Sequence, residues 1–312
     1  MAGRHRIGVI GLGKITQDQH LPVIAKSPAF ELAAISSQRG LTAGKALAFR
    51  NHAELLAKTP DLDAVAVCTP PQARYAIARE SIMAGKHVML EKPPAATLSE
   101  LSDLKRLAAT KGLVLMTTWH SQYNDGVEEA KRLLQQKTVT RLFVEWKEDV
   151  RKWHPGQAWI FRAGGFGVFD PCINALSIVT KIMPEPVAVT GGELFFPANA
   201  DAPIAANLTL SCGGRAQGFS VETDWRPIEK EIWEISIETE DGLALKLFSG
   251  GARLEVNGKV AVDNKAEEYE AIYEHFDRLL TRGESHIDTA PFELVADAFM
   301  VGKRREVEKF EE

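Results

Sequence analysis

Apolar runs of strand length recur through the first 120 residues, and amphipathic stretches lie between them. The runs predict strands at 6–10, 30–35, 64–68, 87–91 and 113–118. The stretches between them predict helices at 21–25, 42–49, 72–84 and 97–111. Thr97 and Glu100 have the spacing of a capping box at the start of the last helix. Because strand and helix alternate, this part of the chain is expected to form an α/β domain on a doubly wound parallel sheet.

The pattern changes near His120, so we expect one domain at 1–120 and a second at 121–312, with no flexible linker between them. From 187 to 262 apolar and polar positions alternate, with turn residues between the runs. This is typical of an open, mostly antiparallel sheet with one exposed face. The other elements expected here are a helix at 125–136, a strand at 139–150, a helix at 175–183 and two closing helices at 267–282 and 292–307. The second domain is therefore also α/β.

Composition narrows the class of protein. The chain has 312 residues, 45% of them hydrophobic and 25% charged, as in an ordinary globular protein of two domains. Its net charge of -5, without a long run of either sign, argues against nucleic acid or an anionic membrane surface as a partner. No apolar run reaches membrane length. The three cysteines form no metal-ligand pattern, so we expect no metal site and a reducing, cytoplasmic environment.

A glycine-rich turn follows the first expected strand. The sequence Gly11-Leu12-Gly13-Lys14-Ile15-Thr16 lies between a strand and a helix, which is the context of a dinucleotide-binding turn. Its two glycines allow a tight turn and a close approach of the backbone to a pyrophosphate, and Lys14 and Ile15 belong to the same turn. Thr16 replaces the third glycine of the fingerprint, so a plain structural turn is the alternative.

The turn after the second expected strand carries Ser37, Gln38 and Arg39. An NAD-selective domain has an acidic residue here that holds the ribose hydroxyls, and this chain has none. Hydroxyl, amide and guanidinium donors suit a 2′-phosphate instead. We therefore expect NADP to be tolerated, with NAD accepted as well. A solvated turn without a ligand is the alternative.

Two expected strands stop at pairs of prolines. Thr69-Pro70-Pro71 follows one strand, and Glu91-Lys92-Pro93-Pro94 follows the next. Ligands of parallel sheets bind beyond the carboxyl ends of the strands, so both stops are candidate cofactor contacts. A lysine at such an end is partly desolvated if it points into a cleft, and it then gives up its proton more readily. Lys92 is thus a candidate proton carrier, with an exposed lysine in a turn as the alternative.

Asp170 and Asn174 lie four residues apart at the start of an expected helix, so they share one face of it. A carboxylate is also favoured at a helix N-terminus, which leaves a purely structural role for Asp170 as the alternative. Beside a dinucleotide turn and a Glu-Lys-Pro stop, the pair points to an active site.

These motifs together resemble the Gfo/Idh/MocA oxidoreductases, the family of glucose-fructose oxidoreductase and inositol dehydrogenase. The matching residues run from the glycine turn through Thr69-Pro70-Pro71 and Glu91-Lys92-Pro93 to Asp170 and Asn174, so the resemblance covers both domains. It implies an N-terminal Rossmann domain and a C-terminal α/β domain with an open sheet. The strings similar to the bacterial L-arabinose and D-galactose 1-dehydrogenase branch are 119–121, 146–150, 151–157 and 169–178.

The resemblance implies that an aldose is oxidised at C1 to its lactone with NAD or NADP. Many family members have a histidine where this chain has Asn174, and an amide cannot take up a proton at neutral pH. The expected base is therefore Asp170 or Lys92, or the two together. Asn174 is then expected to hold a ring hydroxyl.

The same resemblance assigns Glu148 and His154 to the substrate. Glu148 and His154 are expected to hold ring hydroxyls of the sugar. Trp153 and Trp233 are candidate apolar walls for a sugar face, with ordinary core packing as the alternative, and His120 is expected near the nicotinamide. L-arabinose and D-galactose share one ring configuration and differ in the exocyclic CH2OH, so activity on both is expected.

Two other interpretations stay open. One is a different sugar or inositol dehydrogenase of the same family. The other is a sugar- or dinucleotide-sensing regulator without turnover, against which the intact Lys92 and Asp170 argue. An open sheet face in the second domain would favour a homo-oligomer, by analogy with the fold.

Overall fold

The computed structural model describes residues 3–264 and 267–311, and they form two compact units. The first unit takes residues 1–119 and 269–288, and the second takes 120–268 and 289–312. The first unit therefore uses the chain in two segments, whereas the expected division at residue 120 gives each domain one continuous segment. That division stays a prediction.

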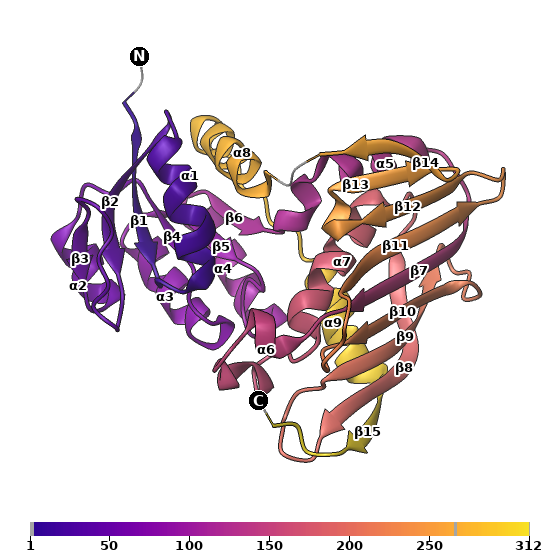
Figure 1. The fold of residues 1–312 in the computed structure, drawn as a ribbon. Helices are drawn as coiled ribbons and strands as arrows, with labels where there is room; N and C mark the ends of the chain where they lie inside the picture. The colour runs from indigo at the N-terminus through magenta and orange to yellow at the C-terminus, as the bar shows by residue number, and fades with distance from the viewer. Residues whose placement is uncertain (1–2, 265–266, 312) are drawn as a thin grey trace. The chain divides into compact units, whose positions relative to one another are not determined.

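A sheet of six parallel strands forms the centre of the first unit (Figure 1). Its order, β3-β2-β1-β4-β5-β6, is that of a doubly wound Rossmann sheet and confirms the expected architecture. Every side chain of β4 is buried, as expected for a strand covered on both faces. The strands are β1 (His5–Ile10), β2 (Phe30–Ser36), β3 (Leu47–Phe49), β4 (Ala64–Val67), β5 (His87–Glu91) and β6 (Leu115–Thr118).

Helices connect these strands. The capping box at the start of α4 is present, since the Glu100 N–H donates to Thr97 Oγ1 at 3.3 Å and the Thr97 N–H donates to Glu100 Oε2 at 3.2 Å. A π-helical turn, Thr16–His20, precedes α1. The helices are α1 (Leu21–Lys26), α2 (His52–Lys58), α3 (Pro71–Met83), α4 (Leu98–Lys111) and, from much later in the chain, α8 (Glu268–Arg282).

The helix expected at 42–49 is wrong. The chain turns at Gly44, which has φ +53°, and then forms β3 at the edge of the sheet, parallel to β2. Leu47 is more than half exposed, so the segment has no buried apolar face on which a helix could pack.

A nine-stranded sheet forms the second unit (Figure 1). Its order is β14-β13-β12-β11-β7-β10-β9-β8-β15, and most neighbouring strands are antiparallel, as expected. The pairs β10–β7 and β15–β8 are parallel. The strands are β7 (Val139–Lys147), β8 (Val187–Pro197), β9 (Ala205–Cys212), β10 (Phe219–Asp224), β11 (Ile232–Thr239), β12 (Ala244–Phe248), β13 (Arg253–Val256), β14 (Lys259–Asp263) and β15 (Lys303–Val307).

Helices cover one face of this sheet and leave the other open (Figure 1). Along β7 the two faces are visible in the burial: Val144 and Trp146 are buried, whereas Glu145 and Lys147 are half-buried. The helices are α5 (Asp125–Leu134), α6 (Val150–Trp153), α7 (Phe169–Ile182) and α9 (Ala290–Val301).

The helix expected at 292–307 is wrong in its second half. α9 ends at Val301, and Gly302 takes an extended conformation with φ -71° and ψ 135°. Residues Lys303–Val307 then pair with β8 as strand β15. The run Lys303-Arg304-Arg305 is exposed, so it offers no apolar face to continue the helix.

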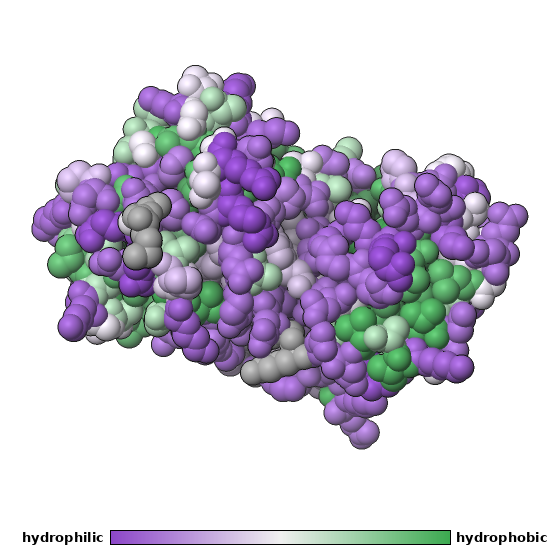
Figure 2. All heavy atoms as spheres, turned by 90° about the horizontal axis from the view of Figure 1, so that it is seen from above, coloured by the Kyte–Doolittle hydropathy of each residue, from purple (hydrophilic) through white to green (hydrophobic). Residues whose placement is uncertain are grey.

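Two features of the surface bear on possible partners. In the described part of the chain, no helix combines the length and the apolar composition needed to cross a bilayer. In Figure 2 hydrophilic side chains cover most of the visible face of the second unit, drawn at the right, and an apolar patch interrupts them.

Candidate active-site residues

The glycine turn in the first unit follows β1 directly. Gly11 has φ +98°, and a Cβ atom there would lie 2.9 Å from the backbone of Cys68 at the end of β4. Gly13 has open space around its Cα, with no atom within 4 Å of an added Cβ. Thr16, which stands at the place of the third glycine, is fully buried and donates its hydroxyl to the Gly11 carbonyl at 2.7 Å. The Thr16 hydroxyl thus forms a hydrogen bond inside the turn, while the backbone at Gly13 stays accessible.

The side chains of Lys14 and Ile15 are exposed beside this turn. Lys14 is paired with Asp18 one helical turn later. Both predicted residues therefore lie on the surface of the turn and are not buried in its interior.

Two arginines gather at the turn after β2. Arg39 donates from its guanidinium to the Leu12 carbonyl at 2.9 Å, which brings it to the glycine turn. Arg50, which sequence reasoning missed, donates to the Gln38 carbonyl at 3.1 Å. Ser37 is buried at the end of β2, and both arginines are exposed. Within residues 3–264 and 267–311, neither arginine is ion-paired with a carboxylate.

The carboxyl ends of β4 and β5 are tied together by Arg74. This arginine, which sequence reasoning also missed, is buried in the first turns of α3 after Thr69-Pro70-Pro71. It donates to the Glu91 carbonyl at 2.5 Å and to the carbonyls of Thr69 and Pro93. One guanidinium therefore fixes the backbone on both sides of Lys92, whose peptide bond to Pro93 is cis.

Glu91 is buried and accepts several hydrogen bonds. His20 Nε2 lies 3.0 Å from Glu91 Oε1, and the Lys92 N–H donates to Glu91 Oε2 at 2.9 Å. Burial lowers the pKa of His20, but its interactions with Cys68, Tyr273 and Glu91 outweigh burial and raise this pKa well above its usual value. Lys92 itself is half-buried.

In the second unit two tryptophans hold Glu148. This carboxylate, just past the end of β7, is buried and accepts from Trp225 Nε1 at 3.1 Å and from Trp233 Nε1 at 2.8 Å. Sequence reasoning predicted Trp233 and missed Trp225. Trp153 packs against Trp233 with ring centroids 5.5 Å apart and donates to Glu231 at 2.5 Å.

His154 joins Asp170 to the same group. His154 Nε2 lies 3.5 Å from Asp170 Oδ2, and its ring packs edge-on against Trp225 with centroids 5.1 Å apart. Asp170 is buried in the first turn of α7, and Asn174 follows one turn later, half-buried. Helix α7 has no side-chain cap, so Asp170 does not serve as its N-cap. The structure thus brings Glu148, His154 and Asp170 together around Trp225.

His120 belongs to another cluster. Its Nδ1 lies 2.7 Å from Glu268 Oε2, and Glu268 also accepts from Asn124 Nδ2 at 2.6 Å. The predicted site residues therefore fall into three groups: the dinucleotide turn with Lys92 in the first unit, the Glu148 group in the second, and His120 with its own partners.

Comparison with known proteins decides the family. The chain is 42% identical to galactose 1-dehydrogenase of Pseudomonas fluorescens over 306 residues, which are 98% of both chains. A family model described as an oxidoreductase family with an NAD-binding Rossmann fold, GFO_IDH_MocA, matches residues 5–119. The chain belongs to the Gfo/Idh/MocA oxidoreductase family.

Solved structures agree with this membership. The crystal structure of D-galactose-1-dehydrogenase from Rhizobium etli is 46% identical, with a TM-score of 0.94 over 100% of this chain and 99% of that one. A 3-ketoreductase from Actinomadura kijaniata shares 17% identity with a TM-score of 0.84 over 98% of this chain and 100% of its own, which shows the common fold. The resemblance inferred from the motifs is confirmed.

As in the Gfo/Idh/MocA family, the first unit has residues that fit a dinucleotide. Gly13 leaves its backbone open, as a pyrophosphate requires, and the guanidinium of Arg39 lies against the same turn. In residues 3–264 and 267–311 we find no cluster of His, Cys, Asp or Glu that could hold a metal ion.

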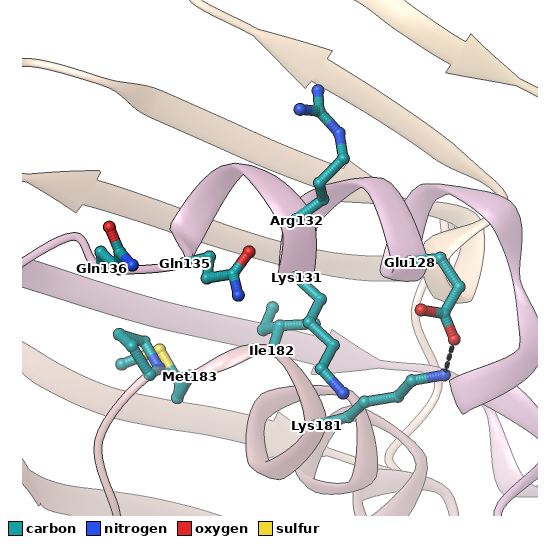
Figure 3. A pocket seen from close by; sticks show the side chains of 9 residues that line it. Glu128, Lys131, Arg132, Gln135, Gln136, Lys181, Ile182 and Met183 are labelled. Carbon is teal, nitrogen blue, oxygen red and sulfur yellow. Dashed lines mark hydrogen bonds and ion pairs between the residues drawn. The ribbon is translucent and has the colours of Figure 1, made fainter.

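A separate hollow in the second unit lies at the other end of α7 (Figure 3). It has a volume of about 400 Å³, and Lys181 and Glu128 in its wall form an ion pair at one end of it. At 1.5 Å per residue, Ile182 in its wall is about 18 Å along the helix from Asp170. None of the predicted site residues lines this hollow, so the Glu148 group remains the candidate site of the second unit.

The two glycines of the turn should respond differently to alanine. Gly11→Ala should destabilise the protein by about 1–3 kcal/mol or more, because it combines a positive φ with a clash against Cys68. Gly13→Ala should leave the melting temperature unchanged and weaken NAD(P) binding about tenfold, because the methyl group would stand where the pyrophosphate approaches. Thermal unfolding and cofactor titration check both. Unchanged cofactor affinity in Gly13→Ala would mean that the turn holds no dinucleotide.

The raised pKa of His20 predicts a pH-dependent stability. Since the folded-state value lies above the unfolded one, the contribution is complete below about pH 6.5 and is lost as the pH rises through the folded-state pKa. The wild type should therefore exceed His20→Gln in unfolding free energy by a larger margin at pH 6 than at pH 9. Urea unfolding of both proteins at the two pH values measures this. An equal difference at both would contradict a charged His20.

Proposed function

We propose that the chain is an NAD(P)-dependent aldose 1-dehydrogenase that oxidises D-galactose, L-arabinose or both at C1 to the sugar lactone. The observation that carries the proposal is the 42% identity to a galactose 1-dehydrogenase along 98% of the chain, which includes the second unit with the Glu148 group. An aldose and a nicotinamide dinucleotide are then its small-molecule partners.

The Glu148 group suits a sugar. Two indole donors fix the orientation of the carboxylate, and an ionised carboxylate has about four acceptor sites, so it can also accept hydrogen bonds from sugar hydroxyls. His154 and Asn174 supply further short polar groups. Trp153 and Trp233 offer aromatic surface for the apolar face of a sugar ring. Polyol recognition depends on such a set, because a buried hydroxyl left without a partner costs about 1–3 kcal/mol.

The chemistry needs one base. Oxidation at C1 releases the proton of the anomeric hydroxyl and a hydride from C1. The nicotinamide, when bound, accepts the hydride. We assign proton removal to Lys92 or Asp170, or to the two together, since Asn174 stands where many family members have a histidine and an amide takes up no proton. His154 Nε2 lies 3.5 Å from that carboxylate and is a neighbour from which it can accept a hydrogen bond.

NADP should be accepted beside NAD. The turn after β2 has no acidic residue to repel a 2′-phosphate. Its Arg39 reaches the glycine turn, and Arg50, which follows β3, contacts the turn after β2 at the Gln38 carbonyl. We therefore assign the 2′-phosphate to these arginines.

A cytoplasmic location and self-association are also part of the proposed function. Cys68, Cys172 and Cys212 are free and buried, as in a reducing compartment, which supports a cytoplasmic location. The open sheet face and the apolar patch in Figure 2 support a homo-oligomer.

The first test is reduction of NAD and of NADP with L-arabinose, D-galactose, D-xylose, D-glucose and myo-inositol. Fast reduction with arabinose or galactose is expected. Lys92→Met and Asp170→Asn should lower kcat about 10²–10⁴-fold, because each removes a candidate base while nearly keeping the shape of the side chain. Lys105→Met, an exposed lysine on α4, is the control. Turnover with myo-inositol alone would indicate another substrate class, and no turnover with any sugar would favour a sensor.

Cofactor preference tests the two arginines. Arg39→Ala and Arg50→Ala should each raise the KM for NADP about tenfold and leave the KM for NAD within about twofold, since only NADP has the phosphate. Arg278→Ala, an exposed arginine on α8, should change neither. If both cofactors are affected equally, the turn does not bind the phosphate.

A further inference from the structure

A buried polar cluster in the first unit adjoins the backbone of Lys92. Its five members are fully or almost fully buried and come from four elements or their ends: His20, Cys68, Glu91, Tyr269 and Tyr273. Two of them, the tyrosines, belong to α8, about 180 residues further along the chain than Glu91.

The cluster is connected by short hydrogen bonds. Tyr269 donates its hydroxyl to Glu91 Oε1 at 2.8 Å, and His20 Nε2 lies 3.0 Å from the same oxygen. Tyr273 Oη lies 2.8 Å from His20 Nδ1. Cys68 Sγ lies 3.6 Å from His20 Nε2. A protonated imidazole donates from both nitrogens, so His20 can bond to Glu91 and Tyr273 at once.

The two carboxylate oxygens of Glu91 accept hydrogen bonds from different groups. Oε1 accepts from α8 and His20, and Oε2 accepts from the backbone N–H of Lys92 at 2.9 Å. A rotation of the carboxylate would therefore move the backbone from which the lysine side chain extends. Because a buried carboxylate without donors is very costly, the donors on Oε1 hold this orientation firmly.

The backbone carbonyls of the same segment are held from the other side. Arg74 donates to the carbonyls of Glu91 and Pro93. Arg74 restrains the position of the segment, whereas Glu91 restrains the orientation of the one N–H that belongs to Lys92.

We propose that Tyr269 and His20 are positioning residues for Lys92 and act on it through the Glu91 carboxylate. The proposal rests on the proposed function, in which Lys92 takes part in removing the proton from the sugar. Tyr273 has a smaller part, because it touches His20 and not Glu91.

The test is a graded series of variants. Glu91→Gln, Tyr269→Phe and Tyr273→Phe each remove one link, and the expected decreases in kcat are about 100-fold, 10-fold and 3-fold. The KM for the sugar should stay within about twofold, because none of these side chains is expected to bind the sugar. Tyr75→Phe is the matched control. Tyr75 lies on α3, and its phenol hydroxyl also donates to a carboxylate, that of Asp103, at 2.9 Å.

A second readout needs no turnover. The rate at which an amine-acylating reagent modifies Lys92, followed by mass spectrometry, reports the environment of its amino group. We expect this rate to change at least threefold in Tyr269→Phe and to stay constant in Tyr75→Phe, with Lys105 as an internal reference. The labelling rate can be measured even if the wild type oxidises none of the sugars. Failure of the proposed function and failure of this inference are therefore distinguishable.

The outcomes are separate. A graded decrease in kcat together with altered Lys92 labelling supports the proposal. Tyr269→Phe could instead lower the melting temperature and leave both kcat and Lys92 labelling unchanged when they are measured well below the unfolding temperature. That result would show that the cluster only stabilises the fold, and it would overturn the proposal. If Tyr269→Phe does not fold, Tyr273→Phe and His20→Gln decide by the same two readouts.

Discussion

A carboxylate taken out of water must be given hydrogen-bond donors, and both units of this protein are organised around one such group. Glu91 ends the fifth strand of the parallel sheet, and Glu148 follows the central strand of the second sheet. Each is buried, and each receives donors from residues distant in sequence: tyrosine and histidine for Glu91, two indoles for Glu148. The aromatic donors exclude water while they satisfy the charge, so each carboxylate keeps one orientation.

This arrangement fixes the surroundings of the predicted site residues in both units. In the first unit the fixed carboxylate and the buried Arg74 together hold the backbone at Lys92. In the second unit Trp225 is shared, since its N–H serves Glu148 and its ring contacts His154, which in turn lies against Asp170. Rigid strand ends and aromatic packing thus hold the Lys92 backbone and the Glu148 carboxylate in fixed positions.

The sequence was informative where function and local structure coincide. The glycine turn, the proline stops and the Asp170–Asn174 spacing are short patterns, and the structure has them at strand ends and in the first turns of a helix. The family follows from these patterns and is confirmed by the similarity along the whole chain. Which of these residues act in catalysis is not decided by pattern or by fold, and their roles remain predictions.

What the sequence did not indicate depends on long-range contacts. Arg74, Trp225 and Tyr269 have no motif of their own, and their partners lie 17, 77 and 178 residues away. A charged residue at a position that a helix buries is the one local signal for Arg74, since such a group requires acceptors. Strand β3 was missed because an exposed edge strand of three residues has too little apolar pattern to be distinguished from a helix turn.

The position of α8 has a consequence for how the protein is made. The first unit takes residues 269–288 as part of its structure, and the two tyrosines that complete the Glu91 cluster are among them. During synthesis, residues 120–268 leave the ribosome before these tyrosines do. A nascent N-terminal sheet therefore lacks these donors, and its Glu91 carboxylate stays partly unsatisfied until α8 has emerged. Although its strands come first in the sequence, the first unit can be completed only after residues 120–268 of the second unit have been synthesised.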